Sequence, residues 1–303
     1  MSNPQISVVM SVFNSEKYLR ESIGSILVQS FNDFEFLIVD DFSTDKSFSI
    51  AKEFAQEDHR IIILSNEKKK GIAGAVNTGL EYAKGKYIAR FDADDYSFPD
   101  RFSVQYDYLE KHKDIVLVGG GYAPFNEQGH RVNIFHPTSE MEIAWRFVSN
   151  MYFCQPAVMF RKNIISEIGD YPSYVGGEDF ALYSKVVQKS RCANLKKILI
   201  RYREHQTNIT LTAKDIIGKS VQKIREENYL FYIGNLTHAD VFFRYQMENK
   251  LSIKKIFAIQ KINSMILNKI RKQYGFSRLH HECIYMFFFL QLRTIIAVIN
   301  HYK

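Results

Sequence analysis

Residues 6–12 read Ile-Ser-Val-Val-Met-Ser-Val, and residues 34–39 read Phe-Glu-Phe-Leu-Ile-Val. Short apolar runs rich in β-branched and aromatic residues are typical of buried strands. Between the two runs, residues 19–27 place leucine and isoleucine at helical spacing. The three segments together predict a strand, a helix and a second strand that lies parallel to the first.

The same alternation continues to about residue 120. Three more strands are expected at 61–64, 87–91 and 115–119, with helices around 50–54 and 73–83. Strands that alternate with helices form a mostly parallel sheet covered on both faces. The sequence therefore predicts an α/β fold with a Rossmann-like, mostly parallel sheet and flanking helices.

Local signals also predict where two helices begin and end. Asn14 or Ser15 is available as the N-cap of the first helix, and Glu16 stands where an acidic side chain favours the helix dipole. Gly85 follows the helix around 73–83 and is expected as its C′ residue, because glycine adopts the left-handed conformation that ends many helices.

Charge divides the chain into two parts. Residues 1–212 hold 25 lysines and arginines against 27 aspartates and glutamates, whereas residues 213–303 hold 15 against 6. The first part is therefore about neutral and the second strongly basic. Such a division favours a catalytic body followed by a segment that meets an anionic partner, either a membrane surface or nucleic acid.

Acidic side chains follow two of the predicted strands. Asp41 comes after the strand at 34–39, and Asp92, Asp94 and Asp95 follow a later one. Ligands of open α/β sheets bind beyond the carboxyl ends of the strands, so these carboxylates are expected at one edge of the sheet. Hard oxygen ligands of this kind suit Mg²⁺ or Mn²⁺. An isolated Asp-x-Asp is more often a solvated acidic turn, so the assignment depends on its surroundings.

Four sequence blocks stand in order between residues 5 and 205. They are Ile6 to Asn14, Ile38 to Asp45, Phe91 to Asp95 with Pro99 and Arg101 after it, and Gly177-Glu178-Asp179 followed by Tyr202-Arg203-Glu204-His205. In this order they closely resemble family 2 glycosyltransferases of the GT-A fold, of the inverting, bacterial surface-polysaccharide type. Any one block is weak, but four in order are specific.

The resemblance implies where the donor would bind. Ser11, Phe13 and Asp41 would cradle the base and ribose of a nucleotide-sugar, with a UDP-sugar as the expected donor. Asp92 would belong to the motif that binds the diphosphate.

The resemblance also implies a divalent cation, Mn²⁺ or Mg²⁺, on the diphosphate. Asp94 is the first choice as its ligand, with Asp95 and His205 as further ligands. Arg203 would pair with phosphate. His205 and Arg203 have an ordinary alternative as partners of nearby carboxylates.

The general base implied by the resemblance is Asp179. A carboxylate near the acceptor hydroxyl can take its proton as that oxygen attacks the anomeric carbon. A single base opposite the leaving group gives one displacement and inversion. Without the other blocks, Glu178-Asp179 would be interpreted as an acidic pair at a helix N-terminus.

This sequence departs from the family pattern at one place. Family members often carry an arginine near the position of Ala75 or Val76, and here that arginine is absent. A phosphate contact assigned to it is therefore in doubt. Lys68 to Lys70 are the available substitutes, although a lysine run is usually a solvated loop.

The expected domains follow from these assignments. Residues 1–210 would form the GT-A catalytic domain, with a nucleotide-sugar half at about 1–120 and an acceptor half at about 121–210. Residues 211–303 would form a basic, helical C-terminal extension.

The apolar run 283–299 in that extension could be interpreted as a membrane-spanning helix. Its 17 residues are short, since a spanning helix needs about 20, and Arg293 inside it would cost about 2.5 kcal/mol or more. One alternative is a buried helix packed on the catalytic body or on a second subunit. The other is a helix that lies on a membrane, and we favour this one. Nucleic acid is not expected as a partner because no recognised motif accompanies the charge. The lysines and arginines expected against anionic headgroups are Lys254, Lys255, Lys261, Lys269, Arg271 and Lys272.

The expected location is the cytoplasm, peripherally on the inner face of the cell membrane. Residues 1–5 are polar, and the run 6–12 has neither a basic flank nor a cleavage site. Cys154, Cys192 and Cys283 are too few and too scattered for a disulfide framework or a zinc site.

Together these inferences predict a metal-dependent hexosyltransferase that acts on a glycan or lipid-linked glycan. Two alternatives stay open. A catalytically silent protein that binds nucleotide-sugar, or scaffolds an assembly at the membrane, would have no need of both a metal site and a base. A sugar-phosphate nucleotidyltransferase would be expected to carry a glycine-rich, basic N-terminal loop, and Ser11 to Tyr18 is not one.

Overall fold

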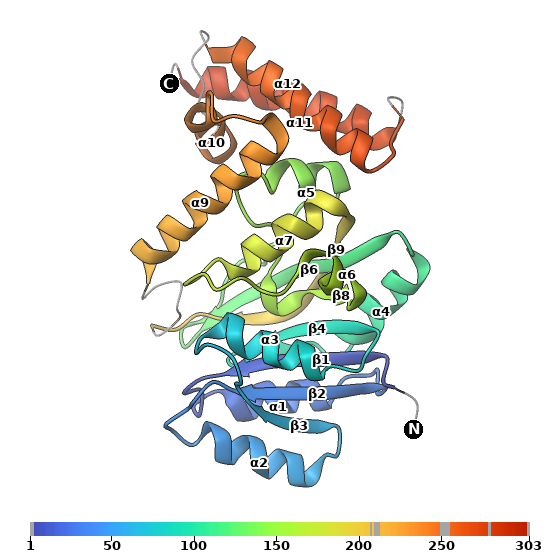
Figure 1. Cartoon of the computed structure of the whole chain (residues 1–303), viewed down its shortest axis with the longest axis vertical. Coiled ribbons are helices and arrows are strands. Elements are labelled where there is room, and N and C mark those ends of the chain that lie inside the picture. The colour runs from blue at the N-terminus through green and yellow to red at the C-terminus, as the bar shows by residue number, and fades with distance from the viewer. Residues whose placement is uncertain (1–2, 207, 209–212, 249–254, 278–279, 302–303) are drawn as a thin grey trace.

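The computed structural model describes residues 3–206, 208, 213–248, 255–277 and 280–301. Within these ranges the chain forms a mixed sheet of nine strands with helices packed against both faces (Figure 1). The strands are β1 (Ile6–Val12), β2 (Phe34–Asp40), β3 (Ile61–Ser65), β4 (Tyr87–Asp92), β5 (Tyr96–Ser97), β6 (Ile115–Asn126), β7 (Gly129–His130), β8 (Met159–Arg161) and β9 (Arg191–Arg203).

The strand order explains where the parallel pattern stops. The sheet runs β3-β2-β1-β4-β8-β6-β9-β5, with β7 paired to β6. The four strands from β3 to β4 are parallel, as expected for the nucleotide half. Beyond them β8 is antiparallel to both neighbours, β6 and β9 are parallel, and β5 is antiparallel to β9. The sheet as a whole is therefore mixed.

The helices cover the sheet and then continue beyond it. Helices α10 to α12 lie at the end of the molecule opposite α2, and α9 leads to them (Figure 1). The predicted boundary between residues 210 and 211 falls outside the described residues. The helices are α1 (Leu19–Leu27), α2 (Ser47–Glu57), α3 (Ile72–Tyr82), α4 (Arg101–Lys111), α5 (Glu140–Arg146), the 3-10 helix η1 (Gln155–Ala157), α6 (Asn163–Ile168), α7 (Glu178–Lys189), α9 (Lys214–Ile233), α10 (Ala239–Glu248), α11 (Ile256–Gln273) and α12 (His281–His301).

Strand β1 contributes to both hydrophobic cores. Val8 and Met10 are fully buried in the cluster that includes Ile23 of α1. Val9 is fully buried in the other cluster, with Val76 of α3. Side chains alternate across a strand, so a continuous apolar run is the pattern of a strand buried on both faces.

Two predictions about helix ends were wrong. Tyr18, not Asn14 or Ser15, precedes α1. Asn14 has a φ of 48°, and its side-chain oxygen accepts the N–H of Thr44 at 2.8 Å, so it serves the neighbouring loop instead. Gly85 does not end α3, because the chain is already extended at residue 83. A Cβ on Gly85 would lie 2.5 Å from the backbone nitrogen of Ser7, so glycine is needed there for close approach to β1.

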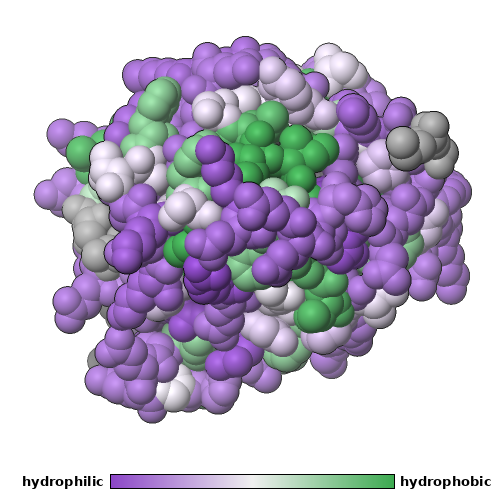
Figure 2. Space-filling model, turned by 90° about the horizontal axis from the view of Figure 1, so that it is seen from below, coloured by the Kyte–Doolittle hydropathy of each residue, from purple (hydrophilic) through white to green (hydrophobic). Residues whose placement is uncertain are grey.

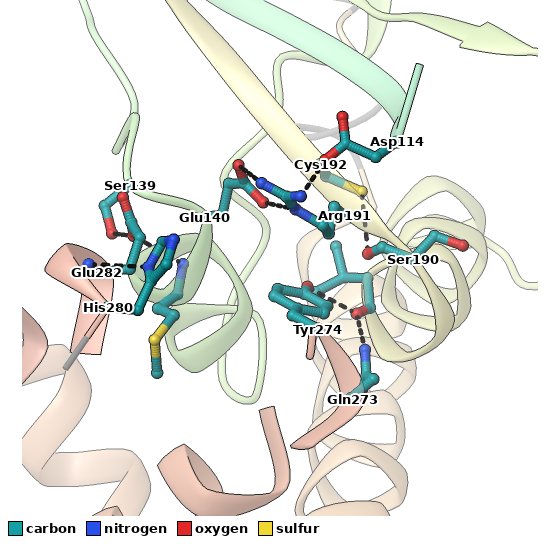
Figure 3. Close-up of polar contacts among 12 residues, drawn as sticks. Asp114, Ser139, Glu140, Ser190, Arg191, Cys192, Gln273, Tyr274, His280 and Glu282 are labelled. Carbon is teal, nitrogen blue, oxygen red and sulfur yellow. Dashed lines mark hydrogen bonds and ion pairs between the residues drawn. The ribbon is translucent and has the colours of Figure 1, made fainter. Parts of the chain in front are cut away.

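Polar contacts fasten α12 to α5 and to Ser139 before it (Figure 3). The Glu282 carboxylate accepts hydrogen bonds from the Ser139 hydroxyl and from the N–H of Met141, the latter at 3.2 Å. The Tyr285 hydroxyl donates to Glu142 at 2.8 Å. One face of α12 is therefore packed on α5, as the alternative of a helix packed on the protein expects.

The end of α11 is fastened in the same way. The side chains of Gln273 and Tyr274 donate to the backbone oxygen of Val187, near the end of α7, at 2.9 and 3.0 Å (Figure 3). In the described part of the chain, no helix combines the length and apolar character needed to cross a bilayer. Seen from the α2 end, the surface is mostly hydrophilic, and hydrophobic side chains gather in separate patches (Figure 2).

Candidate functional site

The sheet topology brings distant segments to one edge. The turn from Asp92 to Asp95 connects β4 to β5, and β5 pairs antiparallel with the end of β9. Arg203 is the last residue of β9, so the chain leaves this strand beside the acidic turn. As a result His205 lies next to Asp94, 111 residues away in the sequence.

Asp94 and His205 face one another. Nε2 of His205 lies 2.8 Å from Oδ2 of Asp94, and the two side chains are 17% and 29% exposed. The ring of Tyr18 packs 4.9 Å from the imidazole, measured between ring centroids. Two groups that commonly bind divalent cations are thus held together with a part of each open to solvent.

Asp95 turns inward and supports the turn. Its side chain is fully buried, and Oδ1 accepts the N–H of Arg203 at 2.7 Å. Its other carboxylate oxygen is buried without a hydrogen-bond partner among the described residues. Burial, followed by the negative charge of Asp94, raises the pKa of Asp95. A metal bond from Asp95 stays a prediction, and it would need this carboxylate to turn outward.

The side chain of Arg203 makes its contacts with other residues of the chain. Its Nε donates to the backbone oxygen of Asp94 at 2.7 Å, and its guanidinium pairs with Glu21. The guanidinium also lies between the rings of Tyr18 and Phe125, at 4.6 and 4.4 Å from their centroids. Arg203 therefore holds the acidic turn in place, and its contact with a phosphate stays a prediction.

Asp92 shares its face of β4 with a buried arginine. Arg90 is fully buried, and its Nη2 lies 3.3 Å from Oδ1 of Asp92. Burial raises the pKa of Asp92 to about 6 although Arg90 lowers it, and the charges of Asp94 and Asp179 raise it further. Sequence reasoning missed Arg90. The available signal was a charged residue inside an apolar strand, two positions before Asp92 and so on the same face.

Asp179 lies in the first turn of α7, behind two glycines. Gly176 and Gly177 have φ values of 73° and 86°, a backbone conformation that favours glycine. Oδ1 of Asp179 accepts the N–H of Phe180 at 2.7 Å. Burial raises the pKa of Asp179 and of its neighbour Glu178, and for Glu178 the charge of Asp179 adds to the effect. Since Asp179 also raises the pKa of Asp92, the two acidic blocks lie within electrostatic reach.

The residues expected around the base and ribose lie at the ends of β1 and β2. Ser11 is half-buried and opposite Asp92 in the strand register. Phe13 is 47% exposed, and the Lys70 ammonium lies 4.3 Å from the centroid of its ring. Asp41 is buried, and its carboxylate accepts hydrogen bonds from the Asn66 side chain at 2.6 Å and from a loop N–H at 2.8 Å. It therefore also positions the loop that carries Lys70.

The described residues include no ready-made cluster of three histidine, cysteine, aspartate or glutamate side chains arranged for a metal ion. Asp94 and His205 supply two groups. Mg²⁺ and similar cations keep several positions for water and substrate phosphates, and one or two protein ligands are enough when a diphosphate supplies the others. The residues present therefore fit a cation that binds together with its diphosphate.

The sequence is similar to known glycosyltransferases. Residues 7–169 match the family described as Glycosyl transferase family 2. The putative glycosyltransferase EpsE of Bacillus subtilis (strain 168) is 36% identical over 209 residues, which cover 67% of this chain and 74% of that protein. The O-antigen biosynthesis glycosyltransferase WbnJ of Escherichia coli is 31% identical over 214 residues, which cover 69% of this chain and 83% of that protein.

Solved structures are similar at lower identity. TarS 1–349 of S. aureus in complex with UDP-GlcNAc has a TM-score of 0.61 and 16% identity, covering 97% of this chain and 90% of that chain. The mannosyltransferase PcManGT of Pyrobaculum calidifontis, with GDP-Man and Mn²⁺, has a TM-score of 0.59 and 14% identity, covering 99% of this chain and 88% of that chain. These likenesses confirm the GT-A fold and the helices that follow it.

Proposed function

The chain belongs to glycosyl transferase family 2, and on that premise we propose that it is a hexosyltransferase that uses a nucleoside-diphosphate sugar. One observation carries the proposal. The acidic turn after β4 and the end of β9 meet at one edge of the sheet, where Nε2 of His205 lies 2.8 Å from Oδ2 of Asp94. A place for a cation and a diphosphate, together with the half-buried carboxylate of Asp179 as the proposed base, suits displacement at an anomeric carbon.

The expected donor is a UDP-sugar, and the expected acceptor is a hydroxyl of a glycan or lipid-linked glycan. The TarS structure with UDP-GlcNAc supports the nucleotide, while PcManGT with GDP-Man makes a GDP-sugar the alternative. The O-antigen relative supports a role in surface-polysaccharide synthesis.

In the proposed reaction Asp179 is the general base. Its carboxylate takes the proton of the acceptor hydroxyl while that oxygen forms a bond to the anomeric carbon. The bond from this carbon to the diphosphate oxygen breaks, and the nucleoside diphosphate leaves with the electron pair. One displacement inverts the configuration at the anomeric carbon. Burial of Asp179 supports this role, because it raises the pKa of the carboxyl and makes the carboxylate a stronger base.

We propose that the donor lies across the ends of β2, β1 and β4. Ser11, Phe13 and Asp41 would contact the base and ribose, and Asp92 would belong to the diphosphate side. The exposed Phe13 ring and the Lys70 ammonium above it support this placement.

Asp94 and His205 would hold Mn²⁺ or Mg²⁺. A bound cation would offset the negative charge that develops on the leaving diphosphate. Asp95 and Arg203 would keep the turn in the geometry that this binding needs, as their hydrogen bond at 2.7 Å suggests.

We further propose that the C-terminal region rests on the inner face of the cell membrane. Four apolar side chains of α12 recur at helical spacing on its exposed side. Excess lysine and arginine in residues 213–303 would attract anionic lipid. Of the basic residues expected at this surface, Lys254 lies outside the described residues. The apolar stripe of α12 consists of Phe288, Leu292, Ile296 and Ile299.

Product analysis tests the function. Purified protein with Mn²⁺, a panel of UDP-sugars and GDP-sugars, and lipid-linked or glycan acceptors should release nucleoside diphosphate and form an inverted linkage. Release of inorganic diphosphate from a nucleoside triphosphate and a sugar phosphate would indicate a nucleotidyltransferase instead. Tight donor binding without any transfer or donor hydrolysis would favour the catalytically silent alternative.

A further inference from the structure

Phe42 adopts a backbone conformation that large side chains avoid. It follows Asp41 at the end of β2 and has a φ of 62°. Left-handed backbone brings Cβ close to the carbonyl oxygen, so a bulky residue at positive φ is an outlier that costs conformational free energy. A glycine at this place would remove the cost.

The surrounding loops impose this conformation. On one side of Phe42 the Asp41 carboxylate is fixed by Asn66 at 2.6 Å. On the other side the Ser43 hydroxyl accepts the N–H of Asn14 at 3.1 Å. The loops after β1 and β2 are thus joined to each other, and Phe42 lies between two residues whose side chains make these contacts.

Burial of the Phe42 side chain contributes little to the stability of the folded protein. The side chain is 52% exposed, so much of its apolar surface stays in water. Phe42 thus combines an unfavourable backbone conformation with an apolar side chain that is exposed to solvent. Such conflicts are typical of functional positions.

The position of Phe42 indicates what it would contact. In the sheet, β2 is next to β1, and β1 is next to β4. Neighbouring strands are about 4.8 Å apart, so the ends of β2 and β4 are separated by about 10 Å. A diphosphate at the end of β4 leaves its nucleoside to extend over β1 and β2. Phe13 follows β1 and Phe42 lies just beyond β2, so both exposed residues belong to the strand ends over which the nucleoside would extend.

We infer that Phe42 is a nucleobase-binding residue of the donor site, and that its ring packs against the base together with Phe13. This inference rests on the proposed nucleotide-sugar donor and adds a further donor-binding residue to it. Stacking of a base on an aromatic ring is sequence-tolerant and contributes substantially to binding. Truncation of Phe42 is expected to weaken nucleotide binding by about tenfold.

Calorimetric titration with two probes tests the inference on the full chain. UDP with Mn²⁺ contains the base, whereas inorganic diphosphate with Mn²⁺ lacks it. Phe42→Ala should weaken the binding of UDP by about tenfold and leave diphosphate binding unchanged. Phe42→Trp should bind UDP about as well as the wild type. The matched control is Phe257→Ala, which removes an 81% exposed ring from α11. It should change neither titration.

Phe42→Gly separates binding from folding. It should melt at or above the wild-type temperature, because glycine tolerates the positive φ, and yet bind UDP as weakly as Phe42→Ala. Equal loss of UDP and diphosphate binding, or unchanged UDP binding in both variants, would overturn the role of Phe42 alone. Wild-type protein that binds neither UDP nor GDP would contradict the donor proposal itself, and this inference with it.

Discussion

Gly176 lies directly against Ile217 of α9: a Cβ placed on Gly176 would fall 2.4 Å from Cγ1 of the isoleucine. The next residue, Gly177, has Ile224 and Val221 of the same helix within 3.3 and 3.6 Å of the corresponding position. The turn that leads into Glu178 and Asp179 is therefore packed on the C-terminal region. Since the end of α7 is also fastened by α11, the basic extension supports the helix that carries the proposed base.

Substitution of Gly176 by alanine should lower kcat by at least about tenfold and lower the melting temperature. The new Cβ would clash with Ile217, and alanine is strained at a φ of 73°. Gly169→Ala is the control for strain alone, because Gly169 has a φ of 87° and no described atom lies within 4 Å of the added carbon. Adding Ile217→Ala to Gly176→Ala should restore part of the activity. Equal losses in Gly176→Ala and Gly169→Ala would show that the contact with α9 is unimportant.

Replacement of Asp179 by asparagine should reduce transfer by at least about a thousandfold while nucleotide binding is retained. The amide cannot accept the proton of the acceptor hydroxyl. Glu178→Gln is the matched control. The substitution removes the carboxylate of the buried neighbour and leaves the proposed base in place. Comparable losses in the two variants would contradict the assignment of the base to Asp179.

The same residue sets an expected pH dependence. Burial raises the pKa of Asp179, so its proton stays bound to a higher pH than the ordinary value of about 3.9. The base is active only when deprotonated. Turnover should therefore fall as the pH falls through this raised pKa, and Glu178→Gln should keep the same acid limb. An acid limb at or below the ordinary aspartate range, measured as kcat against pH with saturating donor, would argue against a buried base.

The sequence was sufficient for much of the fold because its strongest signals are local. The run 6–12 and the segments at 34–39 and 87–91 are strands in the structure, and the helix between the first two is present. Resemblance to a known family identified blocks that the sheet then brings together. Helix ends were harder to predict from the sequence. The side chain of Asn14 bonds to a neighbouring loop, and Gly85 lies against strand β1, so neither residue caps a helix.

Partnerships inside the site could not be derived from the sequence. The bonds of Arg203 to the turn after β4 depend on the pairing of β5 with β9, which joins segments more than a hundred residues apart. Arg90 was overlooked because a single arginine in an apolar strand carries no local sign of its partner. The side chain of Asp95 likewise points inward because it bonds to the backbone of Arg203, a contact that the sequence does not reveal. These features follow from packing in three dimensions, which no spacing rule contains.

His205→Ala should weaken the binding of the cation without abolishing nucleotide binding. Removal of the imidazole leaves Asp94 as the single group of the pair, so half-maximal activity should require about tenfold or more additional Mn²⁺. Asp94→Asn should have the larger effect, because the anionic ligand is lost. The concentration of Mn²⁺ that gives half-maximal transfer is the measurement. Unchanged Mn²⁺ requirements in both variants would remove the two residues from the cation site.

Introduction of a charge into the apolar stripe of α12 should weaken membrane binding. Phe288 is the most exposed residue of the stripe, at 66%, and a glutamate there would replace burial in the headgroup region with repulsion from anionic lipid. Phe288→Glu is expected to reduce sedimentation with vesicles of anionic phospholipid severalfold. Val132→Glu adds the same charge at an 86% exposed residue far from α12 in the sequence and serves as the control.

Binding to anionic vesicles should also fall with salt, because the Debye length shortens from about 10 Å at 0.1 M to about 3 Å at 1 M. Should both variants and the wild type bind anionic vesicles equally, or none bind at all, the stripe would not be a membrane surface. Its exposure would then need a protein partner to explain it.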